Sequence, residues 1–280
     1  MTLKESHADV AGGSRSGAVT SVLRWIGPGP GWHLLERNFL LFRRHAWVII
    51  GGFFEPLFYL LSIGVGLSRL VGDVDLPGNV TVSYPAFIAP AMLASSAMNG
   101  AVMETTFNVF SKLNYSKTYQ TMLSTPLRSR DLAVGDVYWA VARGAVYSSM
   151  FVVVMAAFGL FSSWWALLAL PAAVLVAFAF ASVGLAAMTF MRTRQDLELV
   201  PVATLLMFLF SATFFPLGQY PESAQYVVTA TPLYQGVALI RSLTTGTVGI
   251  EALWHVSYLA IMGLVGLIVA TRRLSKRLTR

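Results

Sequence analysis

Apolar residues are concentrated in six long stretches of this 280-residue chain. The stretches cover residues 46–68, 84–108, 135–160, 164–190, 198–217 and 252–271. An α-helix rises about 1.5 Å per residue, so about 20 residues cross the ~30 Å hydrocarbon core of a bilayer. The pattern predicts an all-α integral membrane domain over residues 46–272, with six transmembrane helices.

The stretch 218–248, before the last predicted span, is apolar in pieces. Tyr226–Thr231 and Leu233–Leu243 are too short to cross a bilayer. The interruptions are at Pro221, Pro232 and Gly236. Backbone groups freed at such breaks must be satisfied inside protein, so we expect a re-entrant or surface helical pair on the external side.

The segments before and after this domain are polar or amphipathic. Residues 1–31 are rich in Gly, Ser and Pro and are interpreted as a disordered cytoplasmic tail. In 32–45, aromatic and leucine residues recur at helical spacing between charged ones, which predicts an amphipathic helix at the membrane interface. A cytoplasmic extension of the first span is the alternative. Residues 273–280 form a basic cytoplasmic tail.

The distribution of basic residues predicts the orientation. Only 12% of residues are charged, against about 25% in soluble domains, and the formal net charge is +7. A nucleic-acid-binding protein would gather these charges on one solvent face, whereas here they lie between apolar stretches. With a cytoplasmic N-terminus, all of the 20 Lys and Arg except Arg69 and Arg241 lie on the cytoplasmic side. Both termini are therefore predicted to be cytoplasmic.

Sequence signals for catalysis are missing. There is no G-x-x-x-x-G-K-[ST] motif to bind nucleotide phosphates, so we do not expect this chain to hydrolyse ATP alone. It has no cysteine, and its four histidines lie at or beyond span ends without metal-ligand spacing. An intramembrane enzyme would need polar residues clustered at one depth, and none are evident. No catalytic or metal-binding residue is predicted.

Two acidic residues interrupt the apolar stretches. Glu55, followed by Pro56, lies in the first, and Glu104 lies near the cytoplasmic end of the second. A charged side chain inside hydrocarbon costs at least ~2.5 kcal/mol, so each must face a partner, a cavity or the interface. These residues are candidates for gating, and pairing of Glu104 with a basic residue such as Lys112 is the alternative. A proton-coupled secondary transporter using Glu55 and Glu104 is a second functional hypothesis, although no inverted repeat supports it.

The longest cytoplasmic loop, 110–134, contains a short predicted helix. Lys112–Leu123 places Leu and Tyr near one face, and Pro126 ends the helix. We interpret it as a docking element for a cytoplasmic partner. A basic helix lying on the membrane is the alternative.

Motifs in this loop and around it resemble those of a known family. The loop carries Thr-Met-Leu-Ser-Thr-Pro-Leu over 121–127, followed by Asp131-Leu132 and Gly135-Asp136. Further motifs are Glu55-Pro56, Tyr84–Pro90, Ala97–Asn99, Glu104–Thr106, Phe214–Leu217, Tyr220-Pro221 and Thr231–Tyr234. Over roughly residues 33–275 the chain resembles the ABC-2 type transporter permeases, in the branch of nodulation lipo-oligosaccharide and drug-resistance exporters.

The resemblance implies an architecture and partners. The expected fold is an ABC-2 (type V exporter-like) domain with an N-terminal interfacial helix and a re-entrant helical pair before the last span. It implies a permease dimer on two copies of a separate ATPase subunit, which would bind ATP and Mg²⁺, in a bacterial cytoplasmic membrane. This chain itself would hold no cofactor. The implied cargo is an amphipathic lipid, a glycolipid or lipo-oligosaccharide, or a drug.

The resemblance also implies roles for individual residues. Coupling to the ATPase is expected of Asn114, Tyr115, Lys117, Thr118, Tyr119, Gln120 and Arg128. Phe214 and Phe215 join Glu55, Pro56 and Glu104 as gating or substrate-path candidates. The external re-entrant segment contributes Tyr220, Pro221, Pro232 and Arg241.

Overall fold

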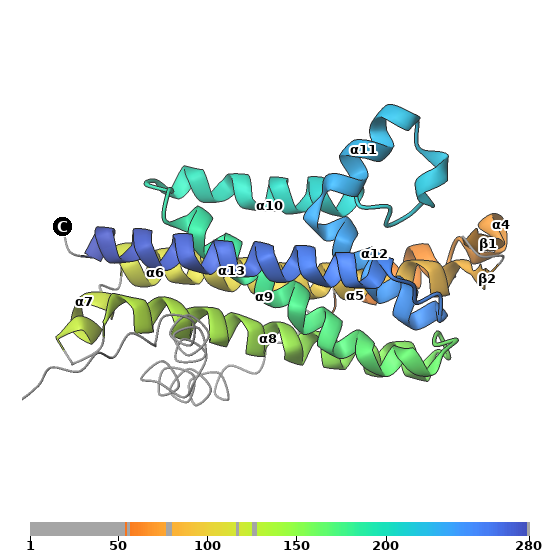
Figure 1. Ribbon diagram of the computed structural model, residues 1–280, viewed down its shortest axis with the longest axis horizontal. Helices are drawn as coiled ribbons and strands as arrows, with labels where there is room; N and C mark the ends of the chain where they lie inside the picture. Colours follow the sequence, from red (N-terminus) through yellow and green to blue (C-terminus); the bar gives the residue numbers. More distant parts are fainter. Residues whose placement is uncertain (1–53, 55–56, 77–79, 116–117, 125–127, 279–280) are drawn as a thin grey trace, which may run out of the picture.

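The computed structural model of the chain describes residue 54 and residues 57–76, 80–115, 118–124 and 128–278. These residues form an elongated bundle of helices (Figure 1). The predicted tail 1–31, the predicted interface helix 32–45 and the Glu55-Pro56 motif lie outside the described residues, as does Lys117.

Four helices in the described part are long and apolar enough to cross a membrane. The first, Tyr84–Asn114, consists of α5 (Tyr84–Met103), a π-helical turn (Glu104–Asn108) and α6 (Val109–Asn114). The others are α8 (Ser129–Ala157), a 3₁₀ turn (Trp164–Leu168) continued by α9 (Ala169–Met188), and α13 (Glu251–Leu278). They match four of the six predicted spans and confirm an all-α membrane fold.

The other two predicted spans correspond to shorter helices. Leu57–Val71 is helical and includes a π-helical turn (Leu60–Val65) and α4 (Ser68–Val71). Helix α10 (Arg194–Leu209) has 16 residues, or about 24 Å, and ends well before residue 217. The chain leaves the helix there, and Ala212 adopts a left-handed φ of 51°. Six spans therefore remain a prediction.

A small β-hairpin was not predicted. Strands β1 (Asp73–Leu76) and β2 (Val80–Ser83) pair antiparallel, with Asp73 opposite Ser83 and Leu76 opposite Val80. Val74 and Val82 point inward from the same face. Each strand has only four residues and lies between predicted spans, where the sequence pattern suggested a loop.

Most of the loop 110–134 is helical. It contains the end of α6, the short helix α7 (Thr118–Leu123) and the first turn of α8. Helix α8 begins at Ser129 because the Asp131 carboxylate accepts a hydrogen bond from the Arg128 backbone N–H at 3.0 Å. α10 begins in the same way, with the Asp196 carboxylate accepting the Thr193 N–H at 3.0 Å.

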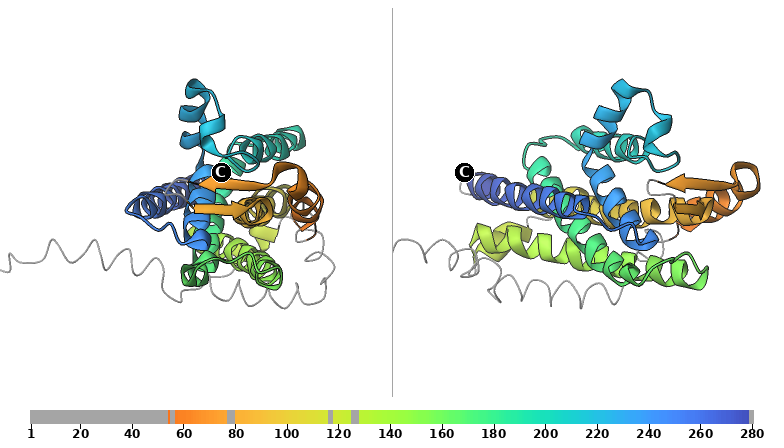
Figure 2. Two further views of the ribbon diagram at one scale, coloured as in Figure 1. Left: turned by 90° about the vertical axis from the view of Figure 1, so that its right-hand side faces the viewer. Right: turned by 45° about the vertical axis from the view of Figure 1, so that its right-hand side comes forward.

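Helix α5 lies at the centre, and α9 packs against α5, α8 and α13 (Figure 2). Small residues permit the close approaches, as is usual between membrane helices. A Cβ atom on Gly144 of α8 would lie 2.8 Å from the Ala177 Cβ of α9. A Cβ on Gly266 of α13 would lie 2.9 Å from the backbone of Ser182 and Val183.

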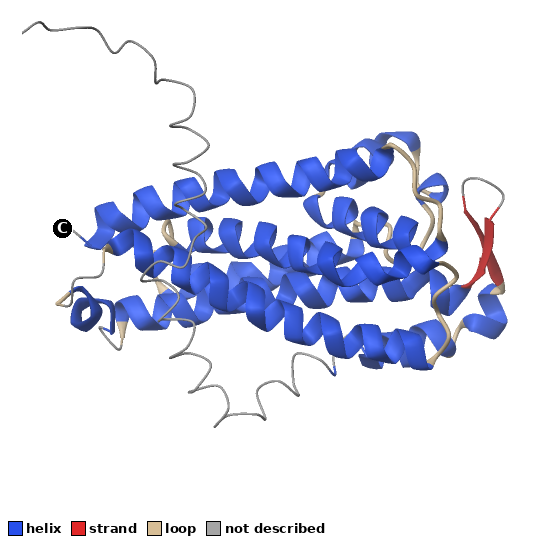
Figure 3. Cartoon of the chain, turned by 60° about the horizontal axis from the view of Figure 1, so that its bottom comes forward, coloured by secondary structure: helices blue, strands red, loops and turns tan. Residues whose placement is uncertain are grey.

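The two ends of the bundle differ in content (Figures 1 and 3). Helix α7, the α9–α10 connection and the C-terminus gather at one end, and the β-hairpin lies at the other. After a 3₁₀ turn (Leu217–Gln219), α11 (Glu222–Ala230) stands out from the bundle, and α12 (Pro232–Thr245) returns to pack on α5 and α13. The described segments that the charge pattern assigns to the cytoplasm therefore share one end.

Candidate functional site

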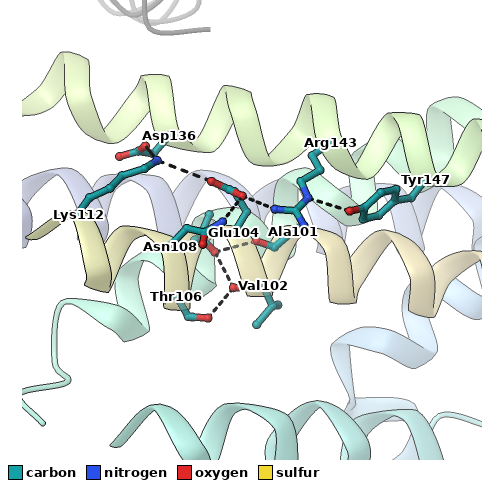
Figure 4. A network of polar contacts seen from close by, with 10 residues as sticks. Ala101, Val102, Glu104, Thr106, Asn108, Lys112, Asp136, Arg143 and Tyr147 are labelled. Atoms are coloured by element: carbon teal, nitrogen blue, oxygen red, sulfur yellow. Dashed lines mark hydrogen bonds and ion pairs between the residues drawn. The ribbon is translucent and has the colours of Figure 1, made fainter. Parts of the chain in front are cut away.

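A network of charged and polar side chains joins the π-helical turn and α6 to α8 inside the bundle (Figure 4). A hydrogen bond to Asp136 extends it to α7. Glu104, Asn108 and Lys112 follow one another at intervals of four residues on the first long helix. Asp136, Arg143 and Tyr147 lie seven and four residues apart on α8. Such intervals place side chains on one helical face, so the two helices present complementary polar stripes to each other.

Glu104 lies at the centre of this network. Its side chain is 3% exposed, and its Oε2 accepts hydrogen bonds from Arg143 Nη1 at 2.5 Å and from Asn108 Nδ2 at 2.6 Å. Lys112 Nζ lies 3.7 Å from the other carboxylate oxygen. The nearest cation is therefore Arg143, and Lys112 is the second. Two cations and an amide donor compensate for the burial of this carboxylate.

The turn of the helix that begins at Glu104 is wider than an α-helical turn. The π-helical turn Glu104–Asn108 interrupts the regular backbone ladder. The Thr106 hydroxyl donates to the Val102 carbonyl at 2.7 Å, and the Thr105 hydroxyl donates to the Ala101 carbonyl at 3.0 Å. These bonds satisfy carbonyl groups at the irregular turn. Single π turns of this kind are frequent at functional sites.

Asp136 connects the network to α7. Its Oδ1 accepts a hydrogen bond from Lys112 Nζ at 2.9 Å, and its Oδ2 accepts one from the Tyr119 hydroxyl. Asp136 is 6% exposed and Tyr119 is 1% exposed. Lys112 thus bridges two acids, one near α7 and one deeper in the bundle.

At the other end of the network, Arg143 bonds to Tyr147 one helical turn further along α8. Arg143 Nε donates to the Tyr147 hydroxyl at 2.9 Å. Gly100 on α5 leaves room for this buried ring, since a Cβ there would lie 2.8 Å from it. From Asp136 to Tyr147 the network extends about 16 Å along α8, roughly half of a hydrocarbon core.

The predicted coupling residues divide into two groups. Asn114 and Tyr115 are exposed, and the Tyr115 ring packs edge-on to Phe110. Arg128 is also exposed and precedes α8. Thr118 is half-buried, whereas Tyr119 faces the protein interior and is inaccessible to a partner. Gln120 belongs to α7, but its side chain is outside the described part.

The predicted external candidates lie near the α10–α12 connection and are not part of the network. The Phe214 ring packs on Phe208 at 5.3 Å between centroids, and Phe215 is exposed. Tyr220 accepts a bond from Gln225 through its carbonyl at 2.9 Å. Pro221 precedes α11 and Pro232 is the first residue of α12.

Arg241 on α12 holds the segment after α10 against α5. Its Nη2 donates to the Ala212 carbonyl at 3.0 Å and its Nε donates to the Phe87 carbonyl at 3.3 Å. Its guanidinium also lies 4.0 Å from the centre of the Phe87 ring. One arginine thus joins the irregular segment after α10 to the central helix.

The sequence did not identify Arg143, Asn108, Asp136 and Tyr147 as site residues. Arg143 was counted with the cytoplasmic charges, although it lies within the apolar stretch 135–160, as Glu104 lies within 84–108. A basic and an acidic residue in adjacent predicted spans, each with polar residues four or seven positions away, could have marked the two polar faces as candidates, but not which residues pair. Within the described chain, no group of three His, Cys, Asp or Glu residues could hold a metal ion.

Comparisons with known proteins give a consistent result. Residues 31–244 match the family model described as "ABC-2 type transporter". Nodulation protein J of Rhizobium leguminosarum bv. viciae is 34% identical over 250 residues, which cover 88% of this chain and 93% of the relative. The protein of the same name from R. leguminosarum bv. trifolii is 34% identical, covering 92% and 95%. That from Rhizobium meliloti (strain 1021) is 30% identical, covering 90% and 96%.

Proposed function

This chain belongs to the ABC-2 type transporter family, and from that membership we propose that it is the membrane-spanning subunit of an ATP-driven exporter. A separate ATPase subunit, present in two copies, binds ATP and Mg²⁺ and supplies the energy. Two permease chains form the transport path, in a bacterial cytoplasmic membrane with both termini in the cytoplasm and six spans in each chain.

The single observation that carries this proposal is the continuous network from α7 to the interior of the bundle. Tyr119 on α7 bonds to Asp136, Asp136 to Lys112, and Lys112 approaches Glu104, which is bonded to Arg143. A protein interior transmits displacement because it is closely packed. When the ATPase subunits close, they move α7, and the network passes this movement to α8 and to the π-helical turn.

The proposed cargo is an amphipathic lipid, glycolipid or lipo-oligosaccharide, with a drug as the remaining possibility. The similarity to proteins named for nodulation supports the oligosaccharide class. The cargo leaves the cytoplasm or the inner leaflet of the membrane.

Proton-coupled transport through Glu104 is the competing hypothesis. A proton carrier must alternate between charged and neutral forms. Glu104 lies between Arg143 and Lys112, and protonation would leave the buried Arg143 without its counter-charge and Lys112 with Asp136 alone. The geometry therefore favours a structural and coupling role for Glu104.

The two hypotheses can be separated in proteoliposomes. The chain is purified from its own bacterium with whatever ATPase subunit accompanies it, and uptake of a fluorescent lipo-oligosaccharide is measured with ATP and Mg²⁺, with and without a protonophore. We expect uptake that requires ATP and persists with the protonophore. Isolation without an ATPase, together with uptake driven by a proton gradient alone, would overturn the proposal.

A further inference from the structure

Three arginines gather at the end of the bundle where α9 and α13 meet. Arg192 follows α9, and Arg273 and Arg277 lie one turn apart on α13. The Arg273 guanidinium lies 3.6 Å from the centre of the Phe190 ring, and Arg277 Nη2 donates to the Met191 carbonyl at 2.6 Å. The positive charges of Arg192 and Arg273 both repel the charge of Arg277.

One buried donor of this cluster is unused. Arg277 Nη1 is buried and has no hydrogen-bond partner among the described residues. Within the same part of the chain, none of the three arginines forms an ion pair with Asp or Glu. The nearby Asp196 carboxylate accepts the backbone N–H groups of Arg192 and Thr193, and its charge attracts that of Arg192 without a close side-chain ion pair. A buried donor without an acceptor, next to like charges, is costly and is the arrangement expected at an anion site.

An apolar cavity begins next to the arginines. Its volume is about 650 Å³, and it lies between α5, α9 and α10. Val102, Val183, Ala187, Leu199, Ala203 and Met207 are among its lining residues. Phe190 and Met191, the two residues held by Arg273 and Arg277, also line it. The cavity has the size of a small-molecule site and a mostly apolar lining, with Asp196 as its charged member. The arginines lie beyond Phe190 and Met191 and do not line it themselves.

We propose that Arg192, Arg273 and Arg277 bind the phosphate of an anionic phospholipid of the inner leaflet, with one of its acyl chains in this cavity. Basic pockets between membrane helices on the cytoplasmic side are suited to such headgroups. The apolar lining matches a hydrocarbon chain, and the guanidinium groups match a phosphate in charge and hydrogen bonding. The cavity borders the π-helical turn through Val102 and Thr106, but the proposal concerns lipid binding alone and is tested without transport or ATP. The leaflet assignment alone uses the proposed orientation.

The test uses the purified full chain in uncharged detergent. Native mass spectrometry measures the apparent Kd for dioleoyl phosphatidylglycerol and for dioleoyl phosphatidylcholine. We expect phosphatidylglycerol to bind at least tenfold more tightly. Arg277→Gln and Arg273→Gln are each expected to weaken phosphatidylglycerol binding about tenfold. Arg272→Gln and Lys276→Gln remove the same charge from neighbouring positions on the same helix that are outside the cluster, and they should change the binding less than twofold.

The acyl-chain part has its own test. Ala203→Phe fills the cavity, so it should weaken phosphatidylglycerol binding at least tenfold. Glycerol 1-phosphate, a headgroup without chains, should not raise the melting temperature at concentrations at which phosphatidylglycerol does. If Arg277→Gln does not fold, Arg273→Gln decides the headgroup part.

Three results would overturn the proposal. Equal losses for Arg272→Gln and Arg273→Gln would mean diffuse attraction to a basic surface. Stabilisation by glycerol 1-phosphate equal to that by the lipid would mean a free-phosphate site. A change in oligomeric state for Ala203→Phe, with lipid affinity unaltered, would mean that a second copy of the chain covers the cavity.

Discussion

The hydroxyl of Tyr119 on α7 donates a hydrogen bond to the carboxylate of Asp136 on α8. Tyr119 is almost fully buried, so this short helix is anchored to the bundle by a ring directed inward. A cytoplasmic partner would therefore contact exposed neighbours such as Tyr115 and not the Tyr119 ring. The proposed coupling element therefore has an inner side that holds the bundle and an outer side that a partner can contact.

Tyr119→Phe removes this bond and keeps the ring. A hydrogen bond to a charged group contributes about 1.5–3 kcal/mol, so we expect a loss of this order in the free energy of unfolding. ATP-driven transport should fall further than ATP hydrolysis, because α7 can still be moved but no longer pulls on Asp136. Unfolding in mixed micelles and transport per ATP in proteoliposomes measure the two effects.

Tyr115→Phe is the matched control for this variant. It removes the same hydroxyl from a ring that is 60% exposed and leaves the edge-on contact with Phe110. Its stability should change by less than about 0.5 kcal/mol. Indistinguishable transport by the two variants would exclude a role for the Tyr119–Asp136 bond in coupling.

The Glu104–Arg143 pair should behave as one unit. Glu104→Gln leaves the Arg143 charge without its acid and Lys112 with Asp136 alone. Arg143→Gln leaves the buried acid with the more distant lysine. Breaking a buried ion pair costs about 3–5 kcal/mol, so each single variant should be strongly destabilised. The double variant removes both charges and should lose less than the sum by about 0.5–3 kcal/mol. Strict additivity of the unfolding free energies would show that the two charges do not interact.

The sequence predicted the long helices well and their ends less well. The thickness of the bilayer sets how many apolar residues a spanning helix needs. Four of the long helices were therefore predicted correctly, from the stretches 84–108, 135–160, 164–190 and 252–271. Helix ends depend on capping groups instead. The Asp131 cap starts α8 at Ser129, six residues before the apolar stretch 135–160 begins. The predicted loop 110–134 is therefore longer than the loop in the structure.

The candidate site was only partly predictable for a different reason. Glu104 could be found alone, because a carboxylate in an apolar stretch requires compensation. Its principal partner, Arg143, could not be found from the sequence. The pairing of Glu104 with Arg143 depends on the register between the first long helix and α8. Composition and periodicity define faces on each helix, but not how two helices align.

Close packing between α9 and α13 gives a prediction at Gly266. Gly266→Ala would place a Cβ 2.9 Å from the Ser182 and Val183 backbone, which cannot rotate away as a side chain could. Overpacking costs about 1–3 kcal/mol, and the higher helix propensity of Ala offsets at most about 1 kcal/mol of that. We expect a net destabilisation in thermal unfolding. Gly249→Ala, where no atom lies within 4 Å of the new Cβ, is the control. Equal stability of the two variants would contradict this packing.

The start of α10 should be sensitive to acid. The backbone N–H groups of Thr193 and Arg192 lower the pKa of the exposed Asp196 carboxyl. A lowered folded-state pKa means that the stabilisation is complete above the unfolded value of about 3.9 and is lost as the pH falls through the folded value. Asp196→Asn should therefore destabilise the chain at neutral pH, and its difference from wild type should shrink below about pH 4. Glu198→Gln, on the same turn of α10, is the control. A difference that stays constant from pH 7 to pH 3 would contradict the capping role.

The orientation of the whole bundle can be decided at two positions, because the native chain contains no cysteine. Asp73 on β1 and Ser124 after α7 are both exposed and lie at opposite ends of the bundle (Figure 1). With cytoplasmic termini, Asp73→Cys should react with a membrane-impermeant maleimide in intact cells, and Ser124→Cys should react only after permeabilisation. The reverse pattern would invert the orientation and place α7 where no cytoplasmic ATPase could reach it. Reaction of both positions in intact cells would mean that the two ends do not lie on opposite sides of a membrane. Because the long helices run between these two ends, a single pair of labels tests the side assignments made from the positive charges in the part of the chain that the structure describes.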